Sequence, residues 1–325
     1  MFKKIITAAA FVSFAVTSFA WTPPKTITII TSQGPGGGNE IAARGLAQIV
    51  EKNNPGTNFV FSYKPGGNNA IAWNYFNEQK TDGANVLIGL AENIATAPPV
   101  LGNKLNMDAS KFVPVTIMAN APLTFVVAID SPIKTVPQLI EAMKASKASG
   151  KKFNFGIGGG VTAKVVHRYL IDQLGIDYND LPSIVYPNTV ELTLATSRGE
   201  LDVGMLNLAA AKKLDGVKTR ILTIASDDVK PGFEKVPLFK DYVKGMSFSS
   251  SWCMWLPINT PKEIVLWYES EFKKAQASKD ASEYFDKVSA YIDSGSVGTD
   301  GAYKKIDEIS QKLGPVASKY VNELK

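Results

Sequence analysis

The chain has 325 residues, of which 45% are hydrophobic, and a formal net charge of +5 at pH 7. This length allows two domains, and the basic residues form no run of the kind that nucleic-acid-binding proteins carry. One Cys and one His allow no internal disulfide and offer too few ligands for the usual zinc sites, so we expect no metal, no other cofactor and no nucleic-acid partner.

The first twenty residues have the three parts of a secretory signal. Lys3 and Lys4 form a basic start, residues 5–16 an apolar core, and Ser18-Phe19-Ala20 a cleavage site between small residues. The apolar run is shorter than the roughly 20 residues that a membrane-spanning helix needs. We therefore predict export to the periplasm with cleavage after Ala20.

The next stretch reads as strand, glycine loop and helix. An alternating strand over residues 26–30 leads into Thr31-Ser-Gln-Gly-Pro-Gly-Gly-Gly-Asn-Glu40, and a helical pattern covers residues 41–50. Glycines let the backbone approach a ligand, and the unpaired N–H groups at a helix start favour an anion. The pattern indicates a seat for a carboxylate or a phosphate, with an ordinary tight turn as the alternative. The candidate ligand-binding residues are Gly36, Gly37, Gly38, Asn39 and Glu40.

A strand over residues 59–63, a helix over 70–80 and a buried strand over 86–89 follow. Ligand contacts in open α/β sheets gather beyond the carboxyl ends of the strands, so Asn93 is a candidate polar contact, with a turn residue as the alternative. Residues 112–118 and 123–129 are extended, and we place the first crossing between two lobes there.

A second strand, glycine loop and helix appear later in the chain. The capping box Thr135-Val-Pro-Gln138 opens a helix to about residue 148, and a strand over residues 152–155 then leads into Gly156-Ile-Gly-Gly-Gly160 and a helical run to residue 174. Two such units predict two lobes, each offering a helix N-terminus to one ligand between them. The second unit adds Gly158, Gly159 and Gly160 to the candidates.

Strands and helices keep alternating to the end, which indicates an α/β architecture. The expected elements are a strand over 183–186, a helix over 190–198, strands over 201–206 and 220–225, an extended segment over 250–256 and, after a second capping box at Thr260-Pro-Lys-Glu263, helices to residue 325 with breaks near 294–298 and 314–315. Asn207, at the end of one strand, is a further candidate contact. We expect a first lobe of residues 22–122 and 227–325 and a second lobe of residues 123–226.

The single Cys and the single His are not expected to carry chemistry. Cys253 lies in the apolar run Trp252-Cys-Met-Trp-Leu256 and is interpreted as a buried core thiol. His167 stands in a helical run and is interpreted as a surface or packing residue.

From residue 21 onward the chain resembles the periplasmic receptors of tripartite tricarboxylate transporters, the TctC or Bug family. The motifs that carry the resemblance occur in order, and they are Trp21-Thr-Pro-Pro-Lys-Thr-Ile-Thr-Ile29, Gly34-Pro-Gly-Gly-Gly-Asn-Glu40, Lys64-Pro-Gly-Gly-Asn68, Asp82-Gly83 before Val86-Leu-Ile-Gly89, Phe153-Asn-Phe-Gly156, Val185-Tyr186, Gly199-Glu-Leu-Asp-Val203, Ser251-Trp252 and Pro257-Ile-Asn-Thr-Pro261. Each motif is weak alone, and their order and spacing carry the resemblance.

The resemblance implies a two-lobed periplasmic binding protein of type II, a Venus flytrap that closes on a small carboxylate. It implies delivery of that ligand to a membrane permease with a large and a small subunit, and we expect a monomer. In the family, two glycine-containing loops hold the carboxylate largely by backbone N–H groups and ordered water. Carried over, these loops are residues 36–40 and 158–164, which brings in Thr162 and Lys164.

The chain departs from the family pattern near the ligand. Asn39-Glu40 replaces the usual Thr-Asp, Thr162-Ala-Lys164 stands where serines and a His are usual, and Tyr186-Pro-Asn188 replaces Tyr-Lys-Gly. The ligand therefore stays open between a di- or tricarboxylate and an aromatic carboxylate. Lys164 is either a partner for a second carboxylate or a solvated lysine. Trp252 and Tyr186 form either an apolar wall for a ring or packing between lobes.

The leading hypothesis is a solute-binding receptor that is not an enzyme. An exported enzyme is the alternative from another class, because Gly156-Ile-Gly-Gly-Gly160 resembles a dinucleotide fingerprint, although Val161 stands where the last small residue belongs. A receptor that signals without transport is the third hypothesis.

Overall fold

The computed structural model describes residues 21–105, 112–146 and 152–324. The expected signal peptide and its cleavage after Ala20 lie outside the described residues. The helix expected to reach about residue 148 ends earlier, at Ala145, with Ser146 as its C-cap. In the part of the chain that is described, no helix is both long and apolar enough to cross a membrane.

The first sheet begins with three parallel strands, β1 (Thr26–Thr31), β2 (Asn58–Tyr63) and β3 (Asn85–Leu90). The helices between them are α1 (Gly38–Asn53) and α2 (Ala70–Asn77), and α3 (Glu92–Leu101) follows β3. All three strands lie at the positions predicted from the sequence.

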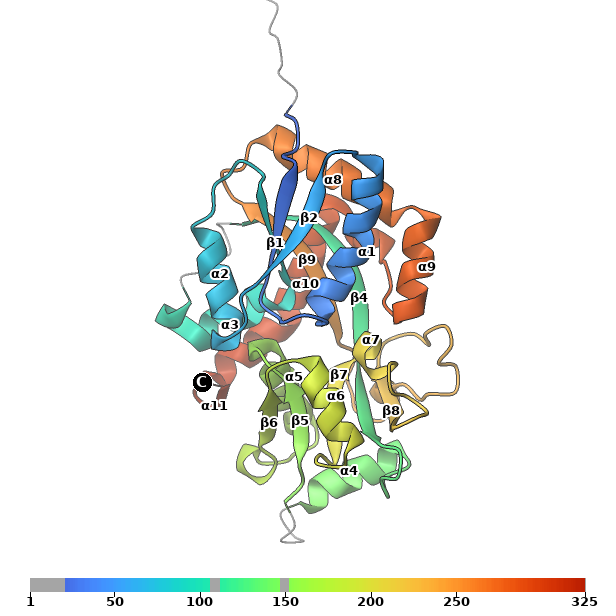
Figure 1. Cartoon of the computed structure of the whole chain (residues 1–325). Helices are drawn as coiled ribbons and strands as arrows, with labels where there is room; N and C mark the ends of the chain where they lie inside the picture. The colour runs from blue at the N-terminus through green and yellow to red at the C-terminus, as the bar shows by residue number, and fades with distance from the viewer. Residues whose placement is uncertain (1–20, 106–111, 147–151, 325) are drawn as a thin grey trace, which may run out of the picture.

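One long strand joins the two sheets. β4 (Phe112–Ala128) runs through the two segments that the sequence predicts as extended. Its first part, to Pro122, pairs with β9 (Ser249–Pro257), and from Leu123 onward it pairs with β7 (Val203–Asn207) and β8 (Thr219–Ala225). The strand order is β2-β1-β3-β9-β4-β7-β5-β6, with β8 on β4, and Figure 1 shows β4 running from the upper sheet into the lower one.

The second sheet adds β5 (Phe155–Gly158) and β6 (Ser183–Tyr186), with helices α4 (Val136–Ala145), α5 (Val161–Gln173), α6 (Thr189–Ser197) and α7 (Leu208–Ala211) around it. The strand expected over residues 152–155 is wrong by three residues. Gly156 is inside β5, because a Cβ there would lie 2.3 Å from Leu201 and only a glycine lets the strand pack so closely. The loop that precedes α5 is therefore only Gly159 and Gly160.

The C-terminal part consists of helices α8 (Lys262–Gln276), α9 (Lys279–Val288), α10 (Gly298–Lys319) and α11 (Val321–Leu324). Short 3-10 turns cover Gly67–Asn69, Gly102–Lys104, Tyr178–Asp180, Phe239–Asp241 and Ser294–Ser296. The break expected near residues 314–315 is wrong, since α10 continues through Pro315. A proline removes one helical hydrogen bond, and the helix tolerates this loss because it packs against the cores of both halves.

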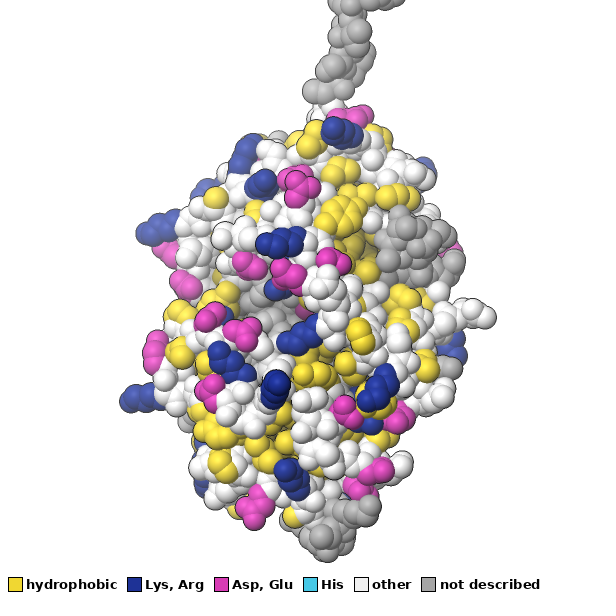
Figure 2. Space-filling view, turned by 180° about the vertical axis from the view of Figure 1, so that it is seen from behind, with side chains coloured by type: hydrophobic (Ala, Val, Ile, Leu, Met, Phe, Trp, Pro, Cys, Tyr) yellow, Lys and Arg dark blue, Asp and Glu magenta, His cyan; other side chains and the backbone are white. Residues whose placement is uncertain are grey.

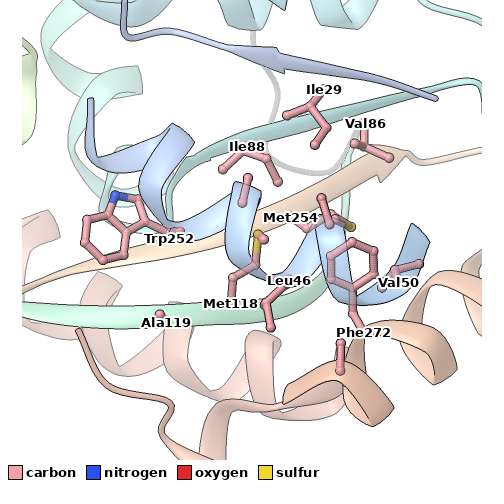
Figure 3. Close-up of a cluster of buried hydrophobic side chains, with 14 of the residues drawn as sticks. Ile29, Leu46, Val50, Val86, Ile88, Met118, Ala119, Trp252, Met254 and Phe272 are labelled. Atoms are coloured by element: carbon pink, nitrogen blue, oxygen red, sulfur yellow. The ribbon is translucent and has the colours of Figure 1, made fainter. Parts of the chain in front are cut away.

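Each face of the first sheet has its own core. In β9, Trp252 and Met254 point into the cluster under α1 and α8, where Figure 3 shows Trp252 at the opposite end from Phe272. Cys253 and Trp255 point to the other face, against α2 and α10. This alternation confirms Cys253 as a buried core thiol, fully enclosed in the cluster.

The segment between β8 and β9 packs with the second sheet. Phe233 belongs to the cluster around Leu192, and Phe239 and Phe248 belong to the cluster around Phe125. We therefore propose that the second lobe extends from residue 123 to about residue 248, and not to residue 226. Leu313 and Ala317 of α10 also pack on the core of the second lobe, whereas Ala302 packs on a core of the first, so α10 spans both lobes.

Candidate functional site

Two helix N-termini from different lobes meet between the sheets. Thr162 in the first turn of α5 lies 2.9 Å from the hydroxyl of Thr96 in α3, and its hydroxyl donates to Asn93 Oδ1 at 3.1 Å. Asn93 is 1% exposed. The structure thus brings together Asn93 and Thr162, two of the residues predicted as ligand contacts, at a point where the lobes touch.

A cavity of about 60 Å³, called here the small cavity, lies beside this contact. Its lining comes from both lobes and includes Asn69, Glu92, Gly159, Gly160, Thr162 and Ser249. Three of these residues are predicted candidates. The sequence did not single out Asn69, Glu92 or Ser249. Glu92 precedes Asn93 and also lies just beyond the end of β3, so the reasoning that selected Asn93 could have selected Glu92.

The second glycine loop offers unpaired amides beside the small cavity. Gly160 is the N-cap of α5 with φ of 111°, a conformation that L-residues with a side chain rarely adopt. The amides of Gly160, Val161 and Thr162 donate no hydrogen bond within the described part of the chain. Unpaired N–H groups at a helix start attract an anion, so this loop has the chemistry of a carboxylate seat.

The first glycine loop already holds an anion of its own. The Gly36 amide donates to Glu40 Oε2 at 2.8 Å, and the amides of Gly37 and Asn39 donate to the Gly34 carbonyl and to Gln33 Oε1. Burial raises the pKa of Glu40, but the Gly36 amide and the Arg44 guanidinium outweigh it and hold the pKa of that carboxyl below its usual value. The amides of Gly38 and Glu40 remain without a partner among the described residues.

This first loop does not line the small cavity. A Cβ at Gly36 would lie 3.9 Å from Val190 of α6, so the loop faces the second lobe at a different place. The Asn39 side chain donates to Thr31 Oγ1 and to the Ile88 carbonyl, which ties the loop to β1 and β3. A Cβ at Gly38 would lie 2.7 Å from the Trp252 ring, so the loop also rests on the core.

Five other candidates lie away from the small cavity. Lys164 Nζ donates to the Leu324 carbonyl at 3.4 Å, and Asn207 caps α7 by accepting from the Ala210 amide. Trp252 is fully buried in the core under α1 and α8, and Tyr186, at the end of β6, packs on the cluster around Leu192 within the second lobe. Gly158 is the last residue of β5.

Glu92 is the buried charged group of the site. Its side chain is the first in α3, is 3% exposed, and accepts from the Ser251 amide at 3.0 and 3.3 Å. Burial raises the pKa of Glu92 to about 7, against the lowering effect of these hydrogen bonds and of Lys305. Glu92 also lines a second, larger cavity of about 210 Å³ on the side of α10.

Neither the single His nor the single Cys lines the small cavity. His167 is fully buried between Phe155 and Tyr178, as a packing residue and not a surface one, and Cys253 is enclosed on the far side of β9 from Trp252. Among the described residues, no group of three His, Cys, Asp or Glu side chains could hold a metal ion. Figure 2 shows mixed acidic and basic side chains around a hollow on the face opposite to that of Figure 1.

Comparisons with known proteins point in one direction. A family model described as "Tripartite tricarboxylate transporter family receptor" matches residues 42–319. A UPF0065 protein of Bordetella pertussis is 23% identical over 284 residues, which cover 86% of this chain and 84% of that protein.

Two solved structures have the same fold. MatC from Rhodopseudomonas palustris with bound malate superimposes with a TM-score of 0.79 at 17% identity, covering 90% of this chain and 98% of that chain. Another R. palustris protein, solved with adipate, gives a TM-score of 0.80 at 20% identity and covers 91% and 97% of the two chains. These similarities confirm the two-lobed α/β fold of periplasmic binding proteins.

Proposed function

Because the chain belongs to the family of tripartite tricarboxylate transporter receptors, the TctC or Bug family, we propose that it captures a small carboxylate in the periplasm and delivers it to a membrane permease with a large and a small subunit. The family consists of solute-binding proteins, and we propose that this member likewise catalyses no reaction. Export would depend on the signal in residues 1–20, with cleavage after Ala20, and the receptor would act as a monomer.

One observation supports a carboxylate as the ligand. The backbone amides at the start of α5 are unpaired, and they lie beside a cavity between the lobes. An anion placed there would accept hydrogen bonds from the amides of Gly160, Val161 and Thr162 while the helix dipole stabilises its charge. The Thr162 hydroxyl already joins α5 to α3, so a ligand bound at this point would contact both lobes at once.

The first glycine loop would have a secondary role in this scheme. The Glu40 side chain accepts the hydrogen bond of the Gly36 amide. The backbone amides of Gly38 and Glu40 are left to donate to a ligand or a water molecule. Trp252 and Tyr186 do not line the small cavity, so no observation favours an aromatic ligand over an aliphatic one. No feature of the described residues favours a sensory role.

A thermal-shift screen of carboxylates tests the proposal, with malate, adipate, succinate, butanoate and 4-aminobutanoate as probes. A ligand that binds only the folded state stabilises it by about 2.7 kcal/mol at a concentration one hundred times its Kd, so at least one probe should raise the Tm. A folded protein whose Tm no carboxylate raises would contradict the proposal.

A matched pair of glycine variants then locates the site. In Gly160→Ala the new Cβ would lie 2.8 Å from Asn69 Nδ2, so Asn69, which lines the small cavity, must shift, and we expect the affinity to fall about tenfold or more. Gly56→Ala is the matched control, because its φ of 101° is close to the 111° of Gly160 and nothing lies within 4 Å of its Cβ. Calorimetry should find unchanged affinity in this control, and equal losses in both variants would remove the second glycine loop from the site.

A further inference from the structure

The small cavity is lined by groups of opposite electrostatic character. Gly159, Gly160 and Thr162 line it at the start of α5, whose unpaired amides favour negative charge. Glu92 is the one charged side chain among the described residues that line this cavity. Lys164, which the sequence offers as a partner for a second carboxylate, donates instead to the Leu324 carbonyl and does not reach the cavity.

The Glu92 carboxylate has few hydrogen-bond partners. Both of its oxygens accept from the Ser251 amide, and the Ser251 side chain and the backbone of Glu92 itself also lower its pKa, although the Ser251 hydroxyl makes no well-formed hydrogen bond among the described residues. A carboxylate can accept several hydrogen bonds, so this almost fully buried group retains capacity to accept another.

The nearby charges do not neutralise Glu92. Lys305 lines the larger cavity together with Glu92 and lowers the pKa of Glu92, but the ammonium group of Lys305 pairs with Glu308 at 3.7 Å. Asp227 and Lys312 also line the larger cavity, and Lys312 donates to the Ser247 carbonyl. The pKa of Glu92 near 7 reflects this weak compensation of a buried charge.

We propose that Glu92 selects a ligand that carries an ammonium group or another hydrogen-bond donor at the end remote from its carboxylate, so that the substrates are amino carboxylates and not dicarboxylates. A ligand ammonium would provide the partner that Glu92 lacks, whereas a second carboxylate would meet it as a like charge. This inference rests on the proposed function, because it places the ligand carboxylate at the amides of α5.

Calorimetry with three ligands of one chain length tests the proposal. Butanoate, 4-aminobutanoate and succinate share four carbons and one carboxylate and differ at the other end, and pentanoate, 5-aminopentanoate and glutarate repeat the comparison with one more carbon. At pH 8, where Glu92 is mostly ionised, the amino carboxylate should bind about tenfold or more tightly than its two companions. Glu92→Gln keeps the size of the side chain and should reduce that preference to about threefold or less.

Two further variants complete the experiment. Glu263→Gln removes the same charge from an exposed position on α8 and should leave the preference unchanged. Glu92→Asp retracts the carboxylate by one methylene and should give an intermediate preference, and it replaces Glu92→Gln if that variant does not fold.

The outcomes separate the two proposals. Tight binding of a dicarboxylate by the wild type, with no change of preference in Glu92→Gln, would overturn the role of Glu92 and leave the carboxylate receptor intact. A folded wild type that binds none of the six probes and none of the wider carboxylate panel would overturn the proposed function and this inference with it. A shift of preference in Glu263→Gln equal to that in Glu92→Gln would also overturn it, because net charge alone would then explain the effect.

Discussion

His167 is buried without a partner for either ring nitrogen within the described part of the chain. Its ring packs 4.6 Å from that of Phe155 between centroids. Burial, aided by the charge of Arg168, lowers its pKa to about 4, so the folded protein keeps this ring neutral where an unfolded chain, with an ordinary His pKa of about 6.5, takes up a proton. The unfolded state therefore gains protons first as the pH falls, and acid weakens the fold.

This gives a pH prediction. The contribution of His167 to stability is complete above about pH 6.5 and is lost as the pH falls toward 4, by about 3 kcal/mol. His167→Phe, which cannot titrate, should lose less stability than the wild type between pH 7.5 and pH 4.5, by about 2–3 kcal/mol. Urea unfolding at the two pH values measures the difference, and identical losses in both proteins would show that His167 gains its proton in the folded state as well.

Residue-level reasoning from the sequence found the glycines and missed the charge between the lobes. Gly159 and Gly160 could be proposed because glycines before a helix expose amides whatever the rest of the fold does, whereas Thr162 came only from the family resemblance. The side chains of Lys164 and Glu92 could not be assigned in the same way. Lys164 donates to the carbonyl of Leu324 in α11, and Glu92 is buried by β9 and α10, so both depend on contacts between distant parts of the chain.

At the scale of elements, the two expected capping boxes have different outcomes. Thr135 and Gln138 form the reciprocal pair, in which Thr135 Oγ1 accepts from the Gln138 amide and the Gln138 side chain accepts from the Thr135 amide. The box expected at Thr260 is wrong. α8 begins after Pro261 as its N-cap, and the hydroxyl of Thr260 is buried with no partner in the described residues.

Thr135→Ala and Thr260→Ala should therefore differ in effect. Loss of a side-chain N-cap costs about 1 kcal/mol, so Thr135→Ala should lower the free energy of unfolding by about that amount. Thr260→Ala removes an unpaired buried hydroxyl and should stay within about 0.5 kcal/mol of the wild type. Denaturant unfolding of both variants checks the pair, and a larger loss in Thr260→Ala would show that its hydroxyl caps α8 in solution.

Local patterns predicted most elements and failed where tertiary packing prevails. Short apolar runs predicted β1, β3, β6 and both parts of β4, with clear alternation in β1 and a continuous buried run in β3. β5 begins later than expected and includes Gly156, because Leu201 packs where a side chain at that position would lie. α10 continues through Pro315 because it packs on the cores of both lobes. Neither cause is visible in the local sequence.

For the whole molecule, the contact between α3 and α5 predicts how the lobes respond to a ligand. Three side chains hold the lobes together beside the small cavity, namely the hydroxyls of Thr96 and Thr162 and the side-chain oxygen of Asn93. A ligand that contacts both lobes should stabilise this arrangement over more open ones. X-ray scattering should show a smaller radius of gyration when a bound carboxylate saturates the receptor. An unchanged radius with a saturating ligand would contradict closure while leaving binding in place.

The lobe organisation was the hardest part to predict from the sequence. Two glycine units indicated two lobes, and the crossing within β4 was expected between residues 112 and 129. The segment from Phe233 to Phe248 has no regular period that would assign it to a lobe, and its aromatic side chains reveal their partners only in the folded chain.

The place of β9 between β3 and β4 has a consequence for a chain that leaves a membrane pore N-terminus first. The central strand of the first sheet emerges only after the entire second lobe, so β1 to β3 must wait beside an open edge. The strands of the second sheet all lie within residues 112–225 and can pair earlier. Unpaired strand edges invite association with other chains, so secretion of this protein exposes its first hundred residues to that hazard for longest, and a periplasmic chaperone that shields them would act before residue 257 appears.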